Sequence, residues 1–261
     1  MKNILTIAGS DSSSGAGIQA DLKTISSLGG YGVCAITAIT SQNSLGVKDV
    51  KAVNGKTVKK QLEAIFDEIK IDAVKIGMVC NKDILKVIIE KLKDLKPTPI
   101  VVDTVTISSS GFPLLDEEAL ELMKNELFKI ATLITPNLKE AEILSGVKIE
   151  NIEDMKKAIY KIEANNILLK GGHLKGDPID ILFQKDSKKI DRFVSKRVVF
   201  EDVHGTGCTL SSAIATFLSQ KNSLFDSVKS AKDYIDGAIK NSFKLAGGSR
   251  YIDHFYRIKN G

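Results

Sequence analysis

Short apolar runs recur along the first two thirds of the chain, each bounded by Gly, Asp or Pro. They cover residues 4–8, 33–40, 73–76, 100–103, 133–135 and 167–170. Runs of this length with these bounds are typical of buried β-strands. Between most of them lie segments with apolar residues three and four apart and charge elsewhere, which is the pattern of an amphipathic helix. These segments cover residues 58–69, 84–95, 117–126 and 152–165.

The alternation of strand and helix predicts a three-layer α/β fold, with a central, mostly parallel sheet flanked by helices on both faces. Two more apolar runs, 179–183 and 193–199, follow one another without a helix between them, which predicts antiparallel edge strands. Two helices are expected after them, at 206–218 and 224–245. Because no linker-like stretch divides the chain, residues 1–261 are expected to form a single domain, with ligands at the carboxyl ends of the strands.

Composition narrows the class of protein. With 43% hydrophobic and 26% charged residues, the 261-residue chain can bury a large core. The net charge of +5 is spread along the chain without a basic stripe, which argues against a nucleic-acid partner. Cys34, Cys80 and Cys208 are odd in number and lack metal-ligand spacing, as in a protein of the reducing cytoplasm. The apolar run at residues 4–8 is too short for a signal peptide, and no stretch could span a bilayer, so we expect no membrane partner.

A glycine-rich turn, Gly205-Thr206-Gly207-Cys208, precedes a run of small, helix-compatible residues. Free backbone N–H groups at the start of a helix, together with the helix dipole, can hold a transferring phosphoryl group. The same field lowers the pKa of a thiol in the first turn, so we expect Cys208 to accept the proton of a substrate hydroxyl. From the local pattern alone, a tight turn with an inert, buried cysteine stays open as the alternative.

A second glycine-rich turn, from Gly9 to Gly17, follows the first predicted strand. It matches the dinucleotide-binding fingerprint in its Gly/Ala form, but residues 37–44 contain no acid to hold a ribose, which argues against a dehydrogenase. The chain has no Walker A loop, which excludes a P-loop NTPase. Asp21, in the helix after the turn, either contacts substrate or only complements the helix dipole.

Two polar groups follow later strands. Asn137 and Glu140 lie three apart at the start of a predicted helix, where they could approach Mg²⁺ or simply form a capping box. Lys170 comes directly before Gly171, Gly172 and His173, again at the end of a strand. His173 is expected to be a loop residue rather than a catalytic one.

In this order, the segments resemble the hydroxymethylpyrimidine and phosphomethylpyrimidine kinases of thiamine synthesis, a branch of the ribokinase-like superfamily. The resemblance covers almost the whole chain and rests on eight runs: residues 5–11, 15–24, 36–43, 75–78, 102–105, 134–142, 170–174 and 204–211. It implies a ribokinase-like fold and a homodimer. It also implies transfer of the ATP γ-phosphoryl group to the hydroxymethyl group of the pyrimidine, and then a second transfer to the monophosphate.

The resemblance also implies roles for single residues. Cys208 would be the catalytic base, and Gly205, Thr206 and Gly207 would form the anion hole. The residues that would bind the pyrimidine are Gly9, Asp21, Gln42, Met78 and Val105. ATP and its phosphates would be bound by Asn137, Glu140, Lys170 and Lys232, with Mg²⁺ at Asp103 and Glu140; Mg²⁺ is expected because phosphoryl transfer needs the developing charge neutralised.

Two segments depart from the family pattern. Ser108-Ser109-Ser110-Gly111 stands where the pyrimidine kinases usually carry a Lys before Ser-Gly, which bears on the second phosphorylation. The run from Gly247 to Tyr251 lacks the usual glycine-and-proline pattern. A pyridoxal or pyridoxine kinase of the same cysteine-bearing branch is the nearest alternative, alone or as a second activity. Gln42 followed by Asn43 favours the pyrimidine. A non-catalytic binding protein with the same fold is the alternative from another class.

Overall fold

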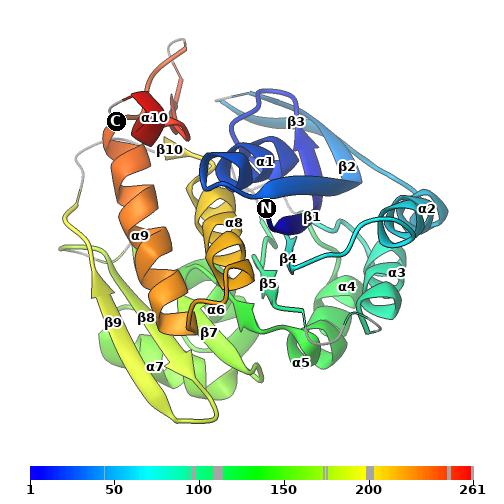
Figure 1. Ribbon diagram of the computed structural model, residues 1–261. Coiled ribbons are helices and arrows are strands. Elements are labelled where there is room, and N and C mark those ends of the chain that lie inside the picture. The colour runs from blue at the N-terminus through cyan, green and yellow to red at the C-terminus, as the bar shows by residue number, and fades with distance from the viewer. Residues whose placement is uncertain are drawn as a thin grey trace.

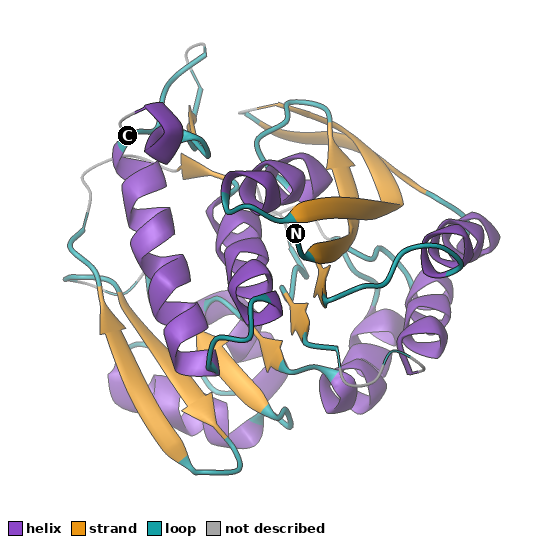
Figure 2. Ribbon diagram, viewed as in Figure 1, coloured by secondary structure: helices purple, strands orange, loops and turns teal. Residues whose placement is uncertain are grey.

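A nine-stranded sheet forms the centre of the computed structural model, which describes residues 1–43, 45–93, 95, 98–107, 114–172, 174, 176–197, 203–245 and 248–259 (Figure 2). The strand order is β3-β2-β1-β4-β5-β6-β7-β8-β9. Strands β2, β1, β4, β5, β6 and β7 run parallel, whereas β3, β8 and β9 are antiparallel to their neighbours. The strands are β1 Asn3–Asp11, β2 Tyr31–Asn43, β3 Gly46–Ala52, β4 Ala73–Ile76, β5 Ile100–Val102, β6 Leu133–Ile134, β7 Asn166–Leu169, β8 Ile179–Gln184 and β9 Lys189–Val194.

Helices cover both faces of this sheet (Figure 1). One face packs against α1 Gly17–Ser27, α8 Thr206–Ser219 and α9 Leu224–Lys240. The other packs against α2 Gly55–Phe66, α3 Lys82–Lys93, α4 Glu117–Leu122, a π-helical turn Met123–Leu127, α5 Phe128–Ile130, α6 Leu138–Ser145 and α7 Ile152–Lys161. The structure therefore confirms the predicted α/β class, with a mostly parallel central sheet, flanking helices and antiparallel edge strands.

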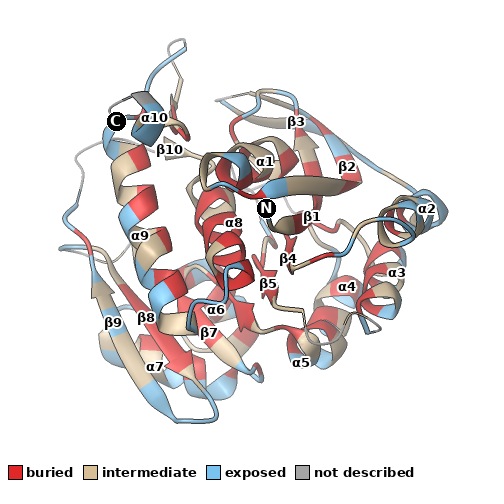
Figure 3. Cartoon of the chain, viewed as in Figure 1, coloured by how far each residue is buried: buried red, intermediate tan, exposed pale blue. Residues whose placement is uncertain are grey.

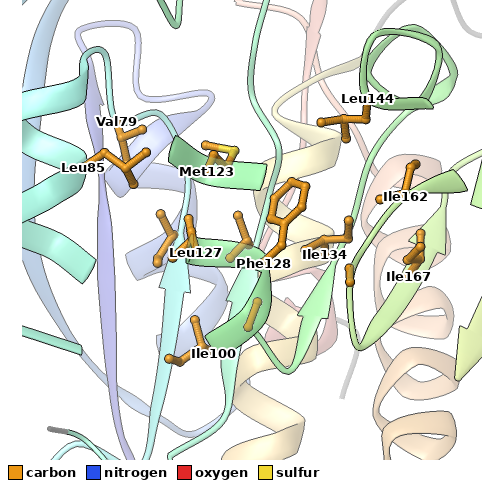
Figure 4. Packing of buried hydrophobic residues seen from close by; sticks show 14 of the residues in the cluster. Val79, Leu85, Ile100, Met123, Leu127, Phe128, Ile134, Leu144, Ile162 and Ile167 are labelled. Carbon is orange, nitrogen blue, oxygen red and sulfur yellow. The ribbon is translucent and has the colours of Figure 1, made fainter. Parts of the chain in front are cut away.

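Successive side chains along a strand point to opposite faces of the sheet and so belong to different cores. Val101 of β5 belongs to the core under α8 and α9, whereas Ile100 and Val102 belong to the core under α2 to α7. That second core is the larger of the two and contains Phe128, a side chain that is 1% exposed (Figure 4). Figure 3 shows the buried residues of α8 continuing along most of its length, as expected for a helix covered by both the sheet and its neighbours.

One predicted strand had the wrong bounds, and one strand was missed. The strand predicted at residues 193–199 is β9, Lys189–Val194, which pairs with β8 through a turn where Lys188 has a φ of 53°. Residues 198–200 lie outside the described part of the chain. The sequence analysis also missed β3, an edge strand whose residues are mostly exposed and which carries Lys48, Asp49 and Lys51. Charged edge strands resist pairing with other chains, and they lack the apolar pattern that reveals buried strands.

Helix ends differ by a few residues. The helix predicted at 224–245 ends at Lys240, because Asn241 bonds back to the Gly237 carbonyl and Phe243 then pairs with Tyr251. A small two-stranded sheet, β10 Val203–His204 and β11 Arg250–Tyr251, precedes the short α10 Tyr256–Lys259. Among the described helices, none combines the length and the apolar character that a membrane span needs. That residues 1–261 form a single domain stays a prediction.

Candidate active site

Most of the predicted site residues lie at one edge of the sheet, where the parallel strands end. Gly9 lies near the end of β1 and Gln42 near the end of β2, while Met78 follows β4. Asp103 follows β5, and Lys170 follows β7 with its backbone N–H donating to the Pro136 carbonyl at 2.8 Å. Since β1, β2, β4, β5, β6 and β7 are parallel, their carboxyl ends meet at the same edge, and this edge is the expected ligand site of an open α/β sheet.

The two glycine-rich turns lie against each other at this edge. Gly205 caps the N-terminus of α8 with a φ of 86°, in the left-handed region that favours glycine. A Cβ at Gly205 would collide with the Gly15 carbonyl oxygen of the first turn. No side chain caps α8, so the N–H groups of its first turn have no side-chain partner from the cap position. The turn at 205–208 thus opens a helix without a side-chain cap, and its role as an anion site stays a prediction.

Asp11 joins the two turns through its carboxylate. One oxygen accepts the backbone N–H and the hydroxyl of Ser13, at 2.8 and 2.9 Å, and the other accepts the N–H of Ala16 at 2.8 Å. His204 Nε2 lies 2.8 Å from the second oxygen and donates to it, since a carboxylate only accepts. Burial alone would raise the pKa of Asp11, but the hydrogen bonds from His204 and Ser13 outweigh it and hold the pKa at about 2.

The predicted pyrimidine contacts other than Asp21 lie near these turns or close to one another. The amide nitrogen of Gln42 lies 3.2 Å from His204 Nε2. Met78 packs so closely on Gly9 that a Cβ there would come within 2.6 Å of its terminal methyl carbon. Met78 also belongs to a small apolar cluster against which Val105 packs. The structure thus places an amide and an apolar surface at the same edge, a combination suited to a flat heteroaromatic ring.

A buried pair of opposite charges lies next to the anion turn. Asp103, 2% exposed, accepts from Lys170 Nζ at 3.0 Å and from the Thr135 hydroxyl at 3.2 Å. A Cβ placed on Gly207 would lie 3.4 Å from the Asp103 carboxylate and 3.6 Å from Lys170 Nζ. Burial on its own would raise the pKa of Asp103, but the charges of Lys170 and Lys75 lower it. An anion at the turn would therefore meet both a cation and a carboxylate.

Asn137 and Glu140 form the capping box that was one of the two alternatives. The Asn137 side chain accepts the Glu140 N–H at 2.9 Å, and Glu140 Oε2 accepts the Asn137 N–H at 2.8 Å. The Thr104 hydroxyl also donates to Oε2, at 3.0 Å, whereas Oε1 accepts no hydrogen bond from the described residues. Burial raises the pKa of Glu140 to about 7, Lys170 opposes this shift, and Asp103 adds to it.

The donor set tests the predicted Mg²⁺ site. In the part of the chain that the structure describes, no cluster of three or more His, Cys, Asp and Glu residues could hold a metal. Two neighbouring carboxylates, Asp103 and Glu140, are present, and no described residue donates to Oε1 of Glu140, which leaves it for a metal ion. Mg²⁺ commonly uses one or two carboxylates together with water and substrate phosphates, so these residues fit the ion when a nucleotide is bound.

Cys208 lies in the first turn of α8, half-buried, and its thiol accepts a hydrogen bond from the Gly17 N–H. The expectation of a lowered thiol pKa was wrong. Burial raises the pKa of Cys208 to about 11, and the carboxylates of Asp21 and Asp103 add to the shift, while Lys75 and the Gly17 N–H oppose it. The helix dipole is outweighed because the thiol is removed from water and faces two negative charges.

Asp21 is enclosed by protein donors. Its carboxylate accepts Lys75 Nζ at 2.9 and 2.8 Å, the Thr6 hydroxyl at 2.6 Å and the Ser212 hydroxyl at 2.7 Å. The side chains of Asp21 and Lys75 are both 0% exposed. A direct contact between Asp21 and a pyrimidine stays a prediction, and it requires one of these hydrogen bonds to be exchanged.

Lys232 also has a protein partner. Its Nζ lies 2.7 Å from Asp180, whose other oxygen accepts the Gly171 N–H at 2.9 Å. Lys232 therefore joins α9 to β8 and to the loop after β7. A role in nucleotide binding stays a prediction that requires this ion pair to open.

Three residues of the site were not assigned a role from the sequence: Asp11, His204 and Lys75. The available signal for Lys75 was its position in the run Ala73-Val74-Lys75-Ile76, since a lysine inside a buried strand needs a partner. Ser108-Ser109-Ser110-Gly111 and His173 lie outside the described residues. So does Gly247, in the run that departs from the family pattern before Tyr251.

The sheet order and the glycine turn that opens α8 beside Asp103 and Lys170 define a kinase with a ribokinase-like fold. The solved structures it resembles agree: a Bacillus subtilis pyridoxal kinase in complex with ADP has a TM-score of 0.89 and 33% identity over 100% of both chains. A phosphomethylpyrimidine kinase from Clostridium difficile 630 has a TM-score of 0.80 and 46% identity over 92% of this chain and 100% of that one. The chain is thus a phosphotransferase that uses ATP.

The chain belongs to the phosphomethylpyrimidine kinase family, whose model matches residues 11–253. It is 46% identical to a hydroxymethylpyrimidine/phosphomethylpyrimidine kinase from Aquifex aeolicus, over 95% of this chain and 98% of the relative. It is 44% identical to a thiamine biosynthesis bifunctional protein from Geobacter sulfurreducens, over 97% of this chain but 52% of the relative. The chain therefore spans about half the length of that bifunctional protein and nearly all of the monofunctional one.

Proposed function

We propose that the protein phosphorylates 4-amino-5-hydroxymethyl-2-methylpyrimidine and then its monophosphate, with ATP as the donor, in thiamine biosynthesis. The observation that carries this proposal is the placement of the Gly205–Cys208 turn beside the buried Asp103–Lys170 pair, at the edge where Gly9, Gln42 and Met78 also lie. Membership of the phosphomethylpyrimidine kinase family supports the same substrate class.

In the proposed reaction, the hydroxymethyl oxygen attacks the γ-phosphorus of ATP. A new P–O bond forms, the bond from the γ-phosphorus to the bridging oxygen of ADP breaks, and the hydroxyl proton passes to the thiolate form of Cys208. The backbone N–H groups of Gly205, Thr206 and Gly207 donate to the phosphoryl oxygens as negative charge develops on them. Lys170 adds a positive charge on the same side. Mg²⁺, held by Asp103 and Glu140, would neutralise charge on the phosphates.

Base catalysis requires Cys208 to lose its proton more readily than a thiol with a pKa of about 11 does. The negative charge of Asp103 is one cause of the raised thiol pKa, so a cation bound at Asp103 would lower that pKa. Gln42 would hydrogen-bond the aminopyrimidine, and Met78 and Val105 would pack on its ring.

The test is ATP consumption with hydroxymethylpyrimidine, its monophosphate and pyridoxal, each supplied separately with Mg²⁺. Turnover of both pyrimidines is expected, with kcat lowered about 10²–10⁴-fold in Cys208→Ala, the range for loss of a general base. Cys34→Ala is the matched control, since Cys34 lies within β2. Unchanged kcat in Cys208→Ala would remove the cysteine from the mechanism while leaving the kinase assignment standing.

A pyridoxal kinase is the second candidate, because pyridoxal kinases reach a TM-score of 0.89 with this structure. Both substrates are flat heteroaromatic rings with a hydroxymethyl group. Turnover of pyridoxal alone would replace the thiamine role and keep the site, whereas turnover of all three compounds would show two activities.

Oligomeric state and location are part of the proposal. The family resemblance supports a homodimer, and light scattering after size-exclusion chromatography would measure the mass directly. A cytoplasmic location follows from the odd number of free cysteines and is tested by cell fractionation.

A further inference from the structure

Lys75 is a fully buried charged residue that the proposed reaction does not use. It lies in β4, and its side chain is 0% exposed. Its Nζ contacts both oxygens of Asp21, which lies on α1, and a Cβ on Gly77 would come within 2.8 Å of the same nitrogen. Lys75 is therefore fixed in one position, between the sheet and the helix that follows the first glycine turn.

Two contacts, one helical turn apart, join α1 to α8. Gly17 at the start of α1 donates its N–H to the Cys208 thiol at the start of α8. Four residues further along each helix, the Ser212 hydroxyl donates to Asp21 at 2.7 Å. Residues four apart lie on the same face of a helix, so Cys208 and Ser212 both face α1. The ion pair thus lies about one turn of helix below the thiol.

The ion pair also acts on the thiol through its charges. Among these charges Lys75 has the largest effect on the pKa of Cys208 and lowers it, whereas Asp21 raises it less. Asp103, after β5, is the third charged group that acts on the sulfur, and it also raises the pKa. The net effect of the Asp21–Lys75 pair on the sulfur is therefore that of a positive charge.

We propose that the Asp21–Lys75 ion pair is a positioning device for Cys208: Asp21 and Ser212 set the register of α8 on α1, and Lys75 stabilises the thiolate that accepts the substrate proton. This inference rests on the proposed role of Cys208 as base. It requires no contact between the substrate and either residue, because both act through Cys208, and it is separate from the predicted contact of Asp21 with the pyrimidine.

A purely structural role is the alternative, because buried ion pairs are often replaceable by uncharged residues without loss of stability. The two roles predict different directions for the effect of each substitution on the pKa of Cys208. If the pair only holds the helices together, Lys75→Met and Asp21→Asn act in the same direction or leave Cys208 unchanged. If the pair sets the charge at the sulfur, the two substitutions act on Cys208 in opposite directions.

The experiment measures alkylation of Cys208 by iodoacetamide across pH 7–12, without substrates, and reads the Cys208 peptide by mass spectrometry. The midpoint of the reaction is expected to rise by about one pH unit in Lys75→Met and to fall in Asp21→Asn. Steady-state kinetics are expected to show kcat about tenfold lower in Lys75→Met, one pKa unit being tenfold, with KM for ATP and the pyrimidine unchanged. Lys82→Met, which removes an exposed lysine, is the matched control.

The double variant Asp21→Asn/Lys75→Met guards against a single variant that does not fold, since it leaves no unpaired charge. Because Lys75 has a larger effect than Asp21 on the thiol, the alkylation midpoint of the double variant is expected to rise. Folded variants whose midpoints do not move, or move together, would overturn the proposal. Full activity of Cys208→Ala would instead contradict the base role, and the alkylation profile still reads the ion pair independently of turnover.

Discussion

The two faces of the sheet differ in what β1 and β4 present to their helices. Toward α2 to α7 the middle of these strands presents the apolar side chains Leu5, Ile7, Val74 and Ile76. Toward α1 and α8 they present Thr6 and Lys75 as well as apolar residues. Both polar residues bind Asp21 of α1, which also accepts a hydrogen bond from Ser212 of α8. Polar groups are buried on the face whose helix α8 begins at the proposed site. The difference suggests that their desolvation is tolerated because they organise Cys208.

Among the substitutions that test this difference between the faces, Lys75→Met is expected to change the free energy of unfolding most. It leaves the Asp21 carboxylate buried without a counter-charge, which is expected to destabilise the fold by about 3–5 kcal/mol. Urea unfolding followed by circular dichroism measures this change. Asp21→Asn/Lys75→Met is expected to recover most of the loss, because no charge is then unpaired. A double variant as unstable as the single one would mean that the packing of Lys75, and not its charge, is what matters.

Phe128→Ala tests the apolar face with a change of similar size. Phe128 is 1% exposed and packs in the core under α2 to α7, so its truncation is expected to cost about 3–5 kcal/mol through lost burial and a cavity. The kcat of the folded fraction is expected to stay at the wild-type value, measured well below the new midpoint of thermal unfolding. A fall in kcat as large as that of Lys75→Met would remove the functional distinction between the faces.

The sequence predicted apolar elements better than polar or charged ones. The strand at residues 73–76 was predicted with its correct bounds, because Ala73, Val74 and Ile76 are apolar and the run is short. The missed strand β3 is exposed and charged, so it offers no such pattern. The glycine turn at 205–208 was identified because two glycines directly before a run of small, helix-compatible residues are typical of a tight turn that opens a helix.

The network under Cys208 could not be predicted in the same way. Asp21 and Lys75 are 54 residues apart in the chain, and no local pattern pairs them. The direction of the Cys208 pKa shift depends on burial and on three charges from separate elements, whereas the sequence shows only the helix that follows. The rule that ligands lie at the carboxyl ends of strands needs topology alone, and Gly9, Gln42 and Met78 do lie together at that edge of the sheet, while their role in binding stays a prediction.

The pH dependence of stability tests the polar face of the sheet, because His254 is buried next to α8. This residue is 3% exposed, and its Nε2 lies 3.1 Å from the Thr209 hydroxyl of α8. Burial lowers the pKa of His254 to about 4, and Lys23 adds to the shift. The unfolded chain therefore binds a proton at His254 near pH 6.5, whereas the folded protein binds it only near pH 4. Stability is lost as pH falls from about 6.5 to about 4.

The expected loss from His254 is up to about 3 kcal/mol across that window. It is measured as the free energy of unfolding in urea at pH 7, 5.5 and 4.5. His254→Gln keeps a group that can bond Thr209 and cannot take up the proton, so the variant is expected to be less sensitive over the same range. Equal pH sensitivity in variant and wild type would assign acid lability to other groups.

The smallest effect is expected from a second ion pair of the same chemistry. Lys82 Nζ lies 2.6 Å from Glu118, with side chains 39% and 72% exposed, whereas Lys75 and Asp21 are fully buried. Water screens the exposed pair, and holding two long side chains together has an entropic cost, so such pairs stabilise a fold little. Lys82→Met is expected to leave the midpoint of thermal unfolding unchanged within error. A drop comparable to that of Lys75→Met would mean that loss of a lysine destabilises this protein wherever it lies, and burial would no longer explain the contrast between the two pairs.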